Sequence, residues 1–410
     1  MKSNIVNNKW IRAAVPALLL HLCIGAVYCW SLLKGPIAES MQLPVGSIEM
    51  AFMLAIFFLG MSAAFGGRLV EKNVKISSWT AAIFYIAGLV CTALSVQSGN
   101  PVNLFLSYGV LMGIGLGLGY LSPVKTLMLW FKDNKGLATG IAICGFGLSK
   151  AIFSPFIEWA VPKVGIVDTL YMMSAVSVLS MGAAALLLKK PENWVEPKDD
   201  AFSLKAMFHD IKEPGFLKIW TLFFLNITCG LCIIGFEKNI LSAAGILSVG
   251  LVSSLAAVFN ASGRLVTATI TDFMKKRKSA YLEIFLRSVF VCIAGAFFFG
   301  SDFFVLLLLF IVNFGYGGGF SSMPALLTEY YPMNKISTIH GYVLSAWAWA
   351  SVASYFLMQL FVYQWNLDYQ NIFVILAGLY FIGYLMTIWI KDRKETGVSE
   401  TAVSDSNLKE

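Results

Sequence analysis

Charge and histidine are scarce in this sequence. Only 13% of its 410 residues are Asp, Glu, Lys or Arg, whereas about 25% is usual in a soluble domain. The three histidines have no spacing typical of a metal site. No nucleophile–base pair and no cofactor-binding loop can be assembled from the polar residues. The sequence therefore predicts neither an enzyme nor a protein with a resident metal or cofactor.

The cysteines and the surplus of positive charge exclude two further classes. All seven cysteines fall inside apolar segments, so they do not form the disulfide framework of a small secreted domain. The net charge of +7 comes from short Lys/Arg clusters between apolar segments, and not from one basic surface. Nucleic acid is therefore not an expected partner.

Long hydrophobic segments dominate the chain, and 58% of its residues are apolar. A helix of about 20 apolar residues crosses the roughly 30 Å hydrocarbon core of a bilayer. By that rule twelve segments are predicted to span a membrane: residues 13–33, 45–65, 77–96, 102–123, 137–156, 167–188, 216–236, 249–271, 280–299, 303–326, 337–359 and 372–390. The sequence thus predicts an all-α, multi-pass integral membrane protein in contact with the lipid bilayer.

Lys and Arg gather in alternate loops between these spans. If the N-terminus is cytoplasmic, only Lys34, Lys163 and Lys238 fall in outer loops. Cytoplasmic loops carry an excess of Lys and Arg. We therefore expect both termini in the cytoplasm and the chain in the plasma membrane, the inner membrane of a prokaryote.

The longest hydrophilic stretch, residues 189–215, divides the spans into two groups of six. Residues 1–188 and 216–390 are each expected to form a six-helix bundle, and residues 391–410 a cytoplasmic tail. Within the stretch, Leu204, Met207, Phe208 and Ile211 share one helical face. This spacing predicts a short helix on the membrane surface, with a plain tether as the alternative.

An internal repeat relates the two groups of spans. Gly-Leu-Gly-Tyr at 117–120 is echoed by Gly-Gly-Gly-Phe at 317–320, and the helix end at 67–71 by that at 268–272. Two halves of the same orientation imply a pseudo-two-fold axis along the membrane normal, which is typical of secondary transporters with a site at mid-depth. Five residues of these repeated segments are candidates for conformational roles: Gly67, Glu71, Asp272, Pro123 and Pro324.

Several motifs resemble those of one transporter superfamily. Gly-x-Leu-x-Glu at 67–71, followed by Lys72 and Lys75, is similar to a loop signature of the major facilitator superfamily, with Glu71 in place of the usual Asp. The segments 25–31 and 113–155 resemble, more narrowly, the oxalate/formate antiporter family, which is related to the monocarboxylate (lactate) transporters.

The resemblance implies a secondary active carrier of small organic carboxylates, such as oxalate, formate, lactate or pyruvate, that works by alternating access. An exchanger of anions is one possibility, and a proton-coupled monocarboxylate symporter is the alternative. A membrane sensor that binds such anions without transporting them is a remote alternative. We expect a monomer whose partners are the carboxylate and either a counter-anion or a proton.

Two cations deep in the predicted spans are candidates for binding the anion. A charge at mid-membrane costs about 2.5–3.5 kcal/mol on an insertion scale and is usually functional. Arg264 can hold a carboxylate through two parallel hydrogen bonds, and it matches the arginine that binds the substrate in the resembling family. Lys150 stands where the family has a small residue. It either provides a second positive charge for the anion, or it snorkels or pairs locally.

Aromatic residues are expected to surround the anion. The resemblance implies this position for Tyr28, Tyr120, Tyr316 and Phe320, with Phe146 and Trp347 as additions. Trp347 stands where antiporters of the oxalate dianion have a second lysine. Tyrosine hydroxyls can donate hydrogen bonds to an anion, and the rings can exclude water. Packing within the bundle is the alternative role for each ring.

Overall fold

The computed structural model describes residues 8–192, 211–212, 214–331 and 335–390. Most of the predicted surface helix within 189–215, and the whole predicted tail 391–410, lie outside the described residues.

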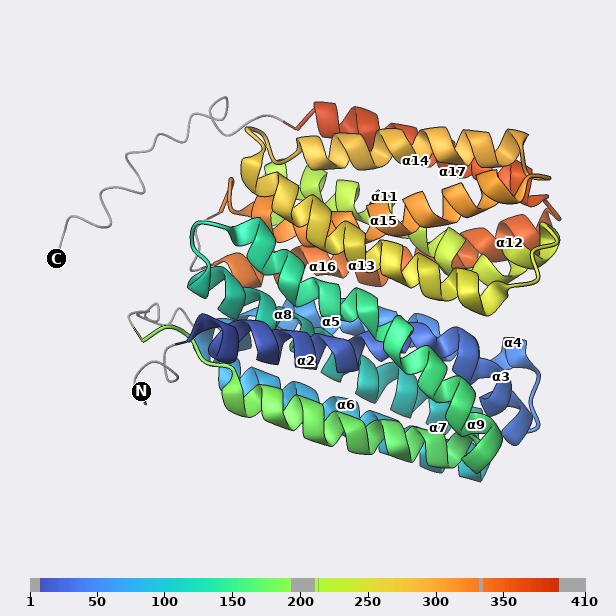
Figure 1. Ribbon diagram of the computed structural model, residues 1–410, viewed down its shortest axis with the longest axis horizontal. Coiled ribbons are helices and arrows are strands. Elements are labelled where there is room, and N and C mark those ends of the chain that lie inside the picture. Colours follow the sequence, from blue (N-terminus) through green and yellow to red (C-terminus); the bar gives the residue numbers. More distant parts are fainter. Residues whose placement is uncertain (1–7, 193–210, 213, 332–334, 391–410) are drawn as a thin grey trace.

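Helices make up the first half of the chain (Figure 1). The first long helical run joins η1 (Trp10–Ala14), α2 (Val15–Ile24), the 3₁₀ segment η2 (Gly25–Cys29) and α3 (Trp30–Ser40). It is followed by α4 (Val45–Ile48), α5 (Met50–Lys72), α6 (Val74–Ser98), α7 (Pro101–Leu104), η3 (Phe105–Met112), α8 (Gly113–Trp130) and α9 (Lys135–Leu187).

The second half is built in the same way. Its helices are α11 (Pro214–Gly235), α12 (Glu237–Ala243), α13 (Val249–Phe273), α14 (Ser279–Phe297), α15 (Asp302–Leu327), α16 (Ile336–Met358), η4 (Gln359–Gln364) and α17 (Tyr369–Ile388).

Eleven of the described helical segments are long and apolar enough to cross a membrane. They cover all twelve predicted spans to within two residues at either end, because α9 covers two of them. Its chain turns at Gly165, where φ is +80° and ψ is 169°. This backbone conformation is accessible to glycine and unfavourable for other residues. The predicted all-α membrane fold is confirmed.

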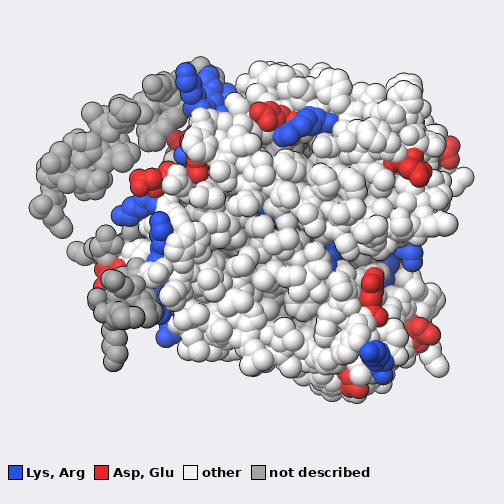
Figure 2. All heavy atoms as spheres, viewed as in Figure 1, with Lys and Arg blue, Asp and Glu red and all other residues white. Residues whose placement is uncertain are grey.

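The helices of the two halves form two groups, which lie one above the other in Figure 1. The most extensive packing between the groups is that of α5 along α16 and of α9 along α13, and α9 also contacts α15. The first and last described residues lie at the same end of the molecule, which we call the terminal face; the other end is the opposite face. In Figure 2 the charged side chains gather mainly towards these two ends, with a largely uncharged band between them.

Glycine permits the close approach of α13 and α15. A Cβ atom on Gly317 would lie only 2.1 Å from the backbone oxygen of Asn260. The glycines of the repeated segment therefore bring backbones together, as small residues do between membrane helices. Pro123 and Pro324 lie buried within α8 and α15.

Candidate functional site

A cavity of about 240 Å³ lies between the two groups of helices, towards the opposite face. Both halves line it. Its polar and charged lining residues include Tyr28, Lys34, Glu49 and Lys150 from the first half, and Asn260 and Asn313 from the second. The molecule is thus hollowed on the side away from its chain ends.

A hydrogen bond between two tyrosines lies at the inner end of this cavity. Tyr28, on the 3₁₀ segment η2, lines the cavity, and its hydroxyl lies 2.9 Å from the hydroxyl of Tyr316 on α15. Tyr316 is 1% exposed and does not line the cavity. The pair joins the two halves and forms a floor, since the residues beyond it are buried. A short 3₁₀ segment within a long helix often marks a hinge.

Arg264 lies beneath this floor and is completely buried. Its Nε donates to Asn260 Oδ1 at 2.8 Å, one helical turn earlier on α13. Its Cζ lies 5.3 Å from the ring centre of Phe146 and 5.1 Å from that of Phe320. Neither Nη1 nor Nη2 has a hydrogen-bond partner among the residues that the structure describes. Two donors of a buried cation are therefore unsatisfied, which is costly unless a ligand accepts from them.

Further aromatic side chains complete the surroundings of Arg264. Trp347 on α16 packs against Phe320 with ring centres 4.4 Å apart, and against Tyr120 of α8 at 5.9 Å. The Tyr120 hydroxyl and Trp347 Nε1 are buried, and no described residue forms a hydrogen bond with either. The structure thus brings seven of the predicted residues into one continuous cluster: Tyr28, Tyr120, Phe146, Arg264, Tyr316, Phe320 and Trp347.

Lys150 is not part of this buried cluster. It lies on α9, is half-buried and lines the cavity on the other side of the tyrosine pair. It forms neither a hydrogen bond nor an ion pair with any residue that the structure describes. The alternative of a local partner for Lys150 therefore finds no support in the described part of the chain.

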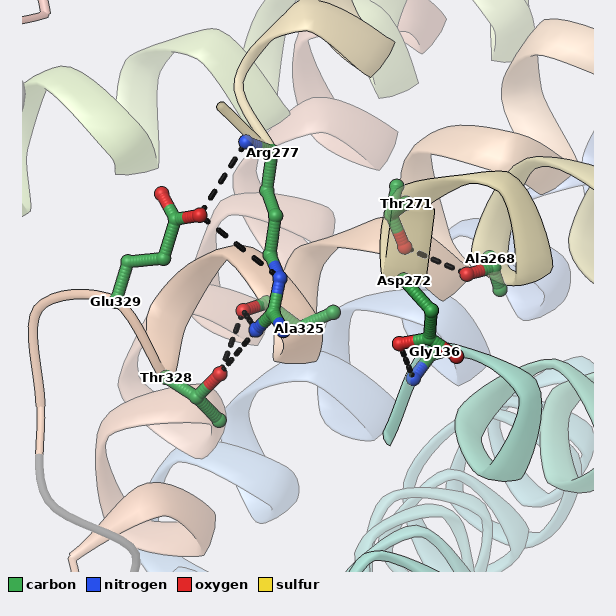
Figure 3. Close-up of polar contacts among 8 residues, drawn as sticks. All are labelled: Gly136, Ala268, Thr271, Asp272, Arg277, Ala325, Thr328 and Glu329. Carbon is green, nitrogen blue, oxygen red and sulfur yellow. Dashed lines mark hydrogen bonds and ion pairs between the residues drawn. The ribbon is translucent and has the colours of Figure 1, made fainter. Parts of the chain in front are cut away.

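The terminal face is closed by contacts between the halves. Asp272, at the end of α13, accepts a hydrogen bond from the backbone N–H of Gly136 at 2.7 Å (Figure 3). It also accepts one from the backbone N–H of Leu137 at 2.9 Å, and both donors lie at the start of α9. The first N–H groups of a helix have no partner within the helix, and its N-terminus favours negative charge. Asp272 therefore caps a helix of the other half.

Glu71, at the end of α5, makes the matching contact on the other side of the repeat. Its Oε1 accepts from the backbone N–H of Ser337 at 2.8 Å, at the start of α16. Its Oε2 forms an ion pair with Lys125 Nζ at 2.7 Å. Gly67 allows this approach, because a Cβ there would lie 2.7 Å from the oxygen of Ser337. Both predicted carboxylates thus cap helices across the two halves.

A third polar cluster lies within the second half alone. Arg277 Nη1 donates to Thr328 Oγ1 at 2.6 Å and to the Ala325 oxygen at 2.8 Å, and its Nε lies 3.8 Å from Glu329 Oε1 (Figure 3). This cluster ties the segment after α13 to the end of α15. The helix caps between the halves are those of Asp272 and Glu71.

Three residues of these contacts were not predicted as site residues from the sequence. Asn260 orients Arg264, Lys125 pairs with Glu71, and His340 lies with its ring centre 6.0 Å from that of Tyr120. His340 Nε2 is buried and has no hydrogen-bond partner within the described ranges of the chain. His340 precedes Trp347 by two helical turns, so the helical period alone would have placed both on one face.

Comparison with known proteins identifies the family. The model of the Major Facilitator Superfamily matches residues 17–354, with a second match over 240–408. The chain belongs to this superfamily. It is therefore a multi-pass membrane transporter, as the motifs predicted.

Individual relatives agree with this assignment. An uncharacterised MFS-type transporter of Escherichia coli, YhjX, is 26% identical over 83% of this chain and 85% of its own length. The oxalate:formate antiporter of Oxalobacter formigenes is 24% identical over 95% of this chain and 93% of its own. Among solved structures, the proton:xylose symporter XylE has a TM-score of 0.72 at 14% identity, covering 96% of this chain and 97% of its own, and so shares the fold.

Proposed function

We propose that this transporter carries small organic carboxylate anions and that Arg264 binds the carboxylate. The observation that carries the proposal is the state of the guanidinium, which is completely buried and whose two terminal nitrogens have no hydrogen-bond partner in the described part of the chain. A carboxylate offers two oxygens at the spacing of those two donors, so it can accept two parallel hydrogen bonds. The similarity to an oxalate:formate antiporter supports the same class of substrate.

The surroundings of Arg264 suit a small anion. The rings of Phe146 and Phe320 lie close to the guanidinium group and leave its terminal donors free. The Tyr120 hydroxyl and Trp347 Nε1 are two more unpartnered donors in the same cluster. Buried donors of this kind discriminate strongly, because a ligand that cannot accept from them leaves them unpaired.

The arrangement of the two halves supports a mechanism of alternating access. We take the terminal face as cytoplasmic, so that the described state is closed to the cytoplasm and open towards the outside. Glu71 and Asp272 hold it closed through the helix caps across the halves. Opening the cytoplasmic side requires both caps to break. Gly67 belongs to this contact, and Pro123 and Pro324 are positioned to let α8 and α15 bend.

We propose anion exchange as the mode of coupling, with each chain acting as a monomer. The acidic residue that lines the cavity, Glu49, is engaged by Lys34 at 2.8 Å. Among the described residues that line the cavity, no carboxylate is left unpaired to carry a proton. A proton-coupled monocarboxylate symporter stays as the second candidate, since a proton can also travel on the substrate.

Uptake into proteoliposomes tests the proposal. Labelled oxalate, formate, lactate and pyruvate are supplied outside, each with and without an internal counter-anion and an imposed pH gradient. We expect uptake of at least one carboxylate that depends on internal anion. Uptake driven by inward protons alone would favour the symporter, and binding without uptake of any of the four would contradict a carrier.

A further inference from the structure

Lys150 lies one helical turn from the buried cluster, on the side of the opposite face. It follows Phe146 by four residues on α9, which is a rise of about 6 Å. Phe146 contacts Arg264 from the first half. Lys150 and Gly147 line the cavity, whereas Phe146 and Arg264 do not. The two cations are therefore at successive depths along one path.

The cavity carries one positive charge without compensation. The charged residues that line it are Lys34, Glu49 and Lys150. Lys34 and Glu49 pair with each other, and their N–O distance is 2.8 Å. Lys150 has no ion pair or hydrogen bond with the described residues. A charge of one sign in a cleft with low-dielectric walls raises the local concentration of the opposite ion.

The floor of the cavity separates Lys150 from Arg264. Tyr28 lines the cavity and is hydrogen-bonded to Tyr316 across the two halves. Arg264 lies beyond this pair and is 0% exposed. An anion that enters from the opposite face therefore meets Lys150 while Arg264 is still covered.

Asn260 contacts both the cavity and the buried arginine. It lines the cavity together with Lys150, while its Oδ1 accepts from Arg264 Nε. Its amide nitrogen is a donor that does not depend on that bond. Asn260, on α13 of the second half, thus adjoins both the cavity that Lys150 lines and the buried Arg264.

From this arrangement we infer that Lys150 and Asn260 form an outer binding site for small carboxylate anions, distinct from the site at Arg264. The outer site captures the anion while the Tyr28–Tyr316 floor is closed, and the anion passes to Arg264 when the floor opens. The inference rests on the proposed function, because the captured anion is the transported one. A second negative charge on the anion strengthens capture, since the outer cation acts as a point charge.

Sided transport kinetics test the outer site. The variants are Lys150→Gln, Lys150→Arg and, as a control, Lys163→Gln on the same face but outside the cavity. Initial rates are measured in right-side-out vesicles with labelled oxalate or formate supplied outside, and in inside-out vesicles for entry from the terminal face. Thermal unfolding in detergent establishes that each variant is folded.

For entry from the opposite face, we expect Lys150→Gln to raise the KM about tenfold, the effect of one lost charge-assisted contact. The maximal rate stays within about twofold, because the site at Arg264 is intact. The increase is larger for oxalate than for formate. Lys150→Arg and Lys163→Gln keep the normal KM, and the KM for entry from the terminal face does not change in any variant.

Two results would overturn the outer site. An equal rise of the KM from both faces would place Lys150 at the shared central site, and an unchanged KM from both faces would exclude it from binding. Failure of the proposed function is a separate outcome. It would appear as normal transport by Arg264→Gln, whatever the behaviour of Lys150→Gln.

Discussion

Weakening the cap at Asp272 should open the terminal face. In the described state Asp272 accepts from Gly136 and Leu137, at 2.7 and 2.9 Å. The contact joins the two halves, so it stabilises this state and is lost when the halves separate there. Asp272→Asn keeps one acceptor oxygen but loses the other and the negative charge at the helix N-terminus.

The size of the effect follows from the energy of a helix cap. Loss of a capping side chain costs about 0.5–2 kcal/mol, and a hydrogen bond to a charged group contributes about 1.5–3 kcal/mol. We take about 1–2 kcal/mol for Asp272→Asn, because the site is only partly buried. The ratio of the described state to the state open at the terminal face should then fall by a factor of about 5–30. Asp272→Ala, which removes both acceptors, should lower it further.

Distances between spin labels on the opposite face report this ratio. The labels are attached at Lys163→Cys and Lys238→Cys, one in each half, in a chain whose native cysteines are replaced. The shorter-distance population should grow in Asp272→Asn, because closure of the opposite face accompanies opening of the terminal face. Asp302→Asn, at the start of α15 on the opposite face, serves as the control. Identical distance distributions in Asp272→Asn, Asp272→Ala and the control would refute the role of the cap.

Three further variants test other contacts. Lys125→Met leaves the Glu71 carboxylate without the Lys125 cation, and we expect the free energy of unfolding to fall by about 1–3 kcal/mol, seen as a lower Tm in detergent. Adding Glu71→Gln should restore part of the Tm, and equal Tm values for the single and double variants would contradict the ion pair. Gly317→Ala places a Cβ 2.1 Å from a backbone oxygen of α13 and should lower the free energy of unfolding by about 1–3 kcal/mol. Gly378→Ala, where a Cβ would have no atom within 4 Å, should leave the Tm unchanged. Equal Tm values for the two variants would argue against close packing of α13 and α15. Tyr28→Phe removes the Tyr28–Tyr316 hydrogen bond across the cavity floor, which contributes about 0.5–1.5 kcal/mol. A guanidinium-specific reagent should then reach Arg264 more easily and inactivate the transporter several-fold faster. An unchanged rate of inactivation would show that the tyrosine pair does not cover Arg264.

Hydrophobic periodicity and the internal repeat predict much of this fold. Each of the twelve predicted spans is covered by an observed helical segment to within two residues at either end, and the two segments in α9 are separated at Gly165, between the predicted spans 137–156 and 167–188. Span length and composition are local properties, so the sequence reports them directly. The depth of Arg264 within its span follows from the same counting.

The arrangement across the two halves could not be predicted from local patterns. The Tyr28–Tyr316 bond and the cap of Glu71 on α16 depend on how one half is rotated against the other. The same rotation leaves Lys150 in the open cavity and Arg264 beneath its floor, although both are cations deep in predicted spans. Periodicity gives the face and depth of a residue on its own helix, and not which conformation of the carrier exposes it.

Transport by variants of Arg264 tests the central claim most directly. Uptake of the carboxylate found for the unsubstituted transporter is compared in Arg264→Lys, Arg264→Gln and a control, Arg287→Gln, which removes an exposed guanidinium paired with Glu283. The account predicts that both Arg264 variants fold and lose most transport, since lysine cannot make two parallel hydrogen bonds, while the control transports normally. Near-normal uptake by folded Arg264→Gln would contradict carboxylate binding at this residue.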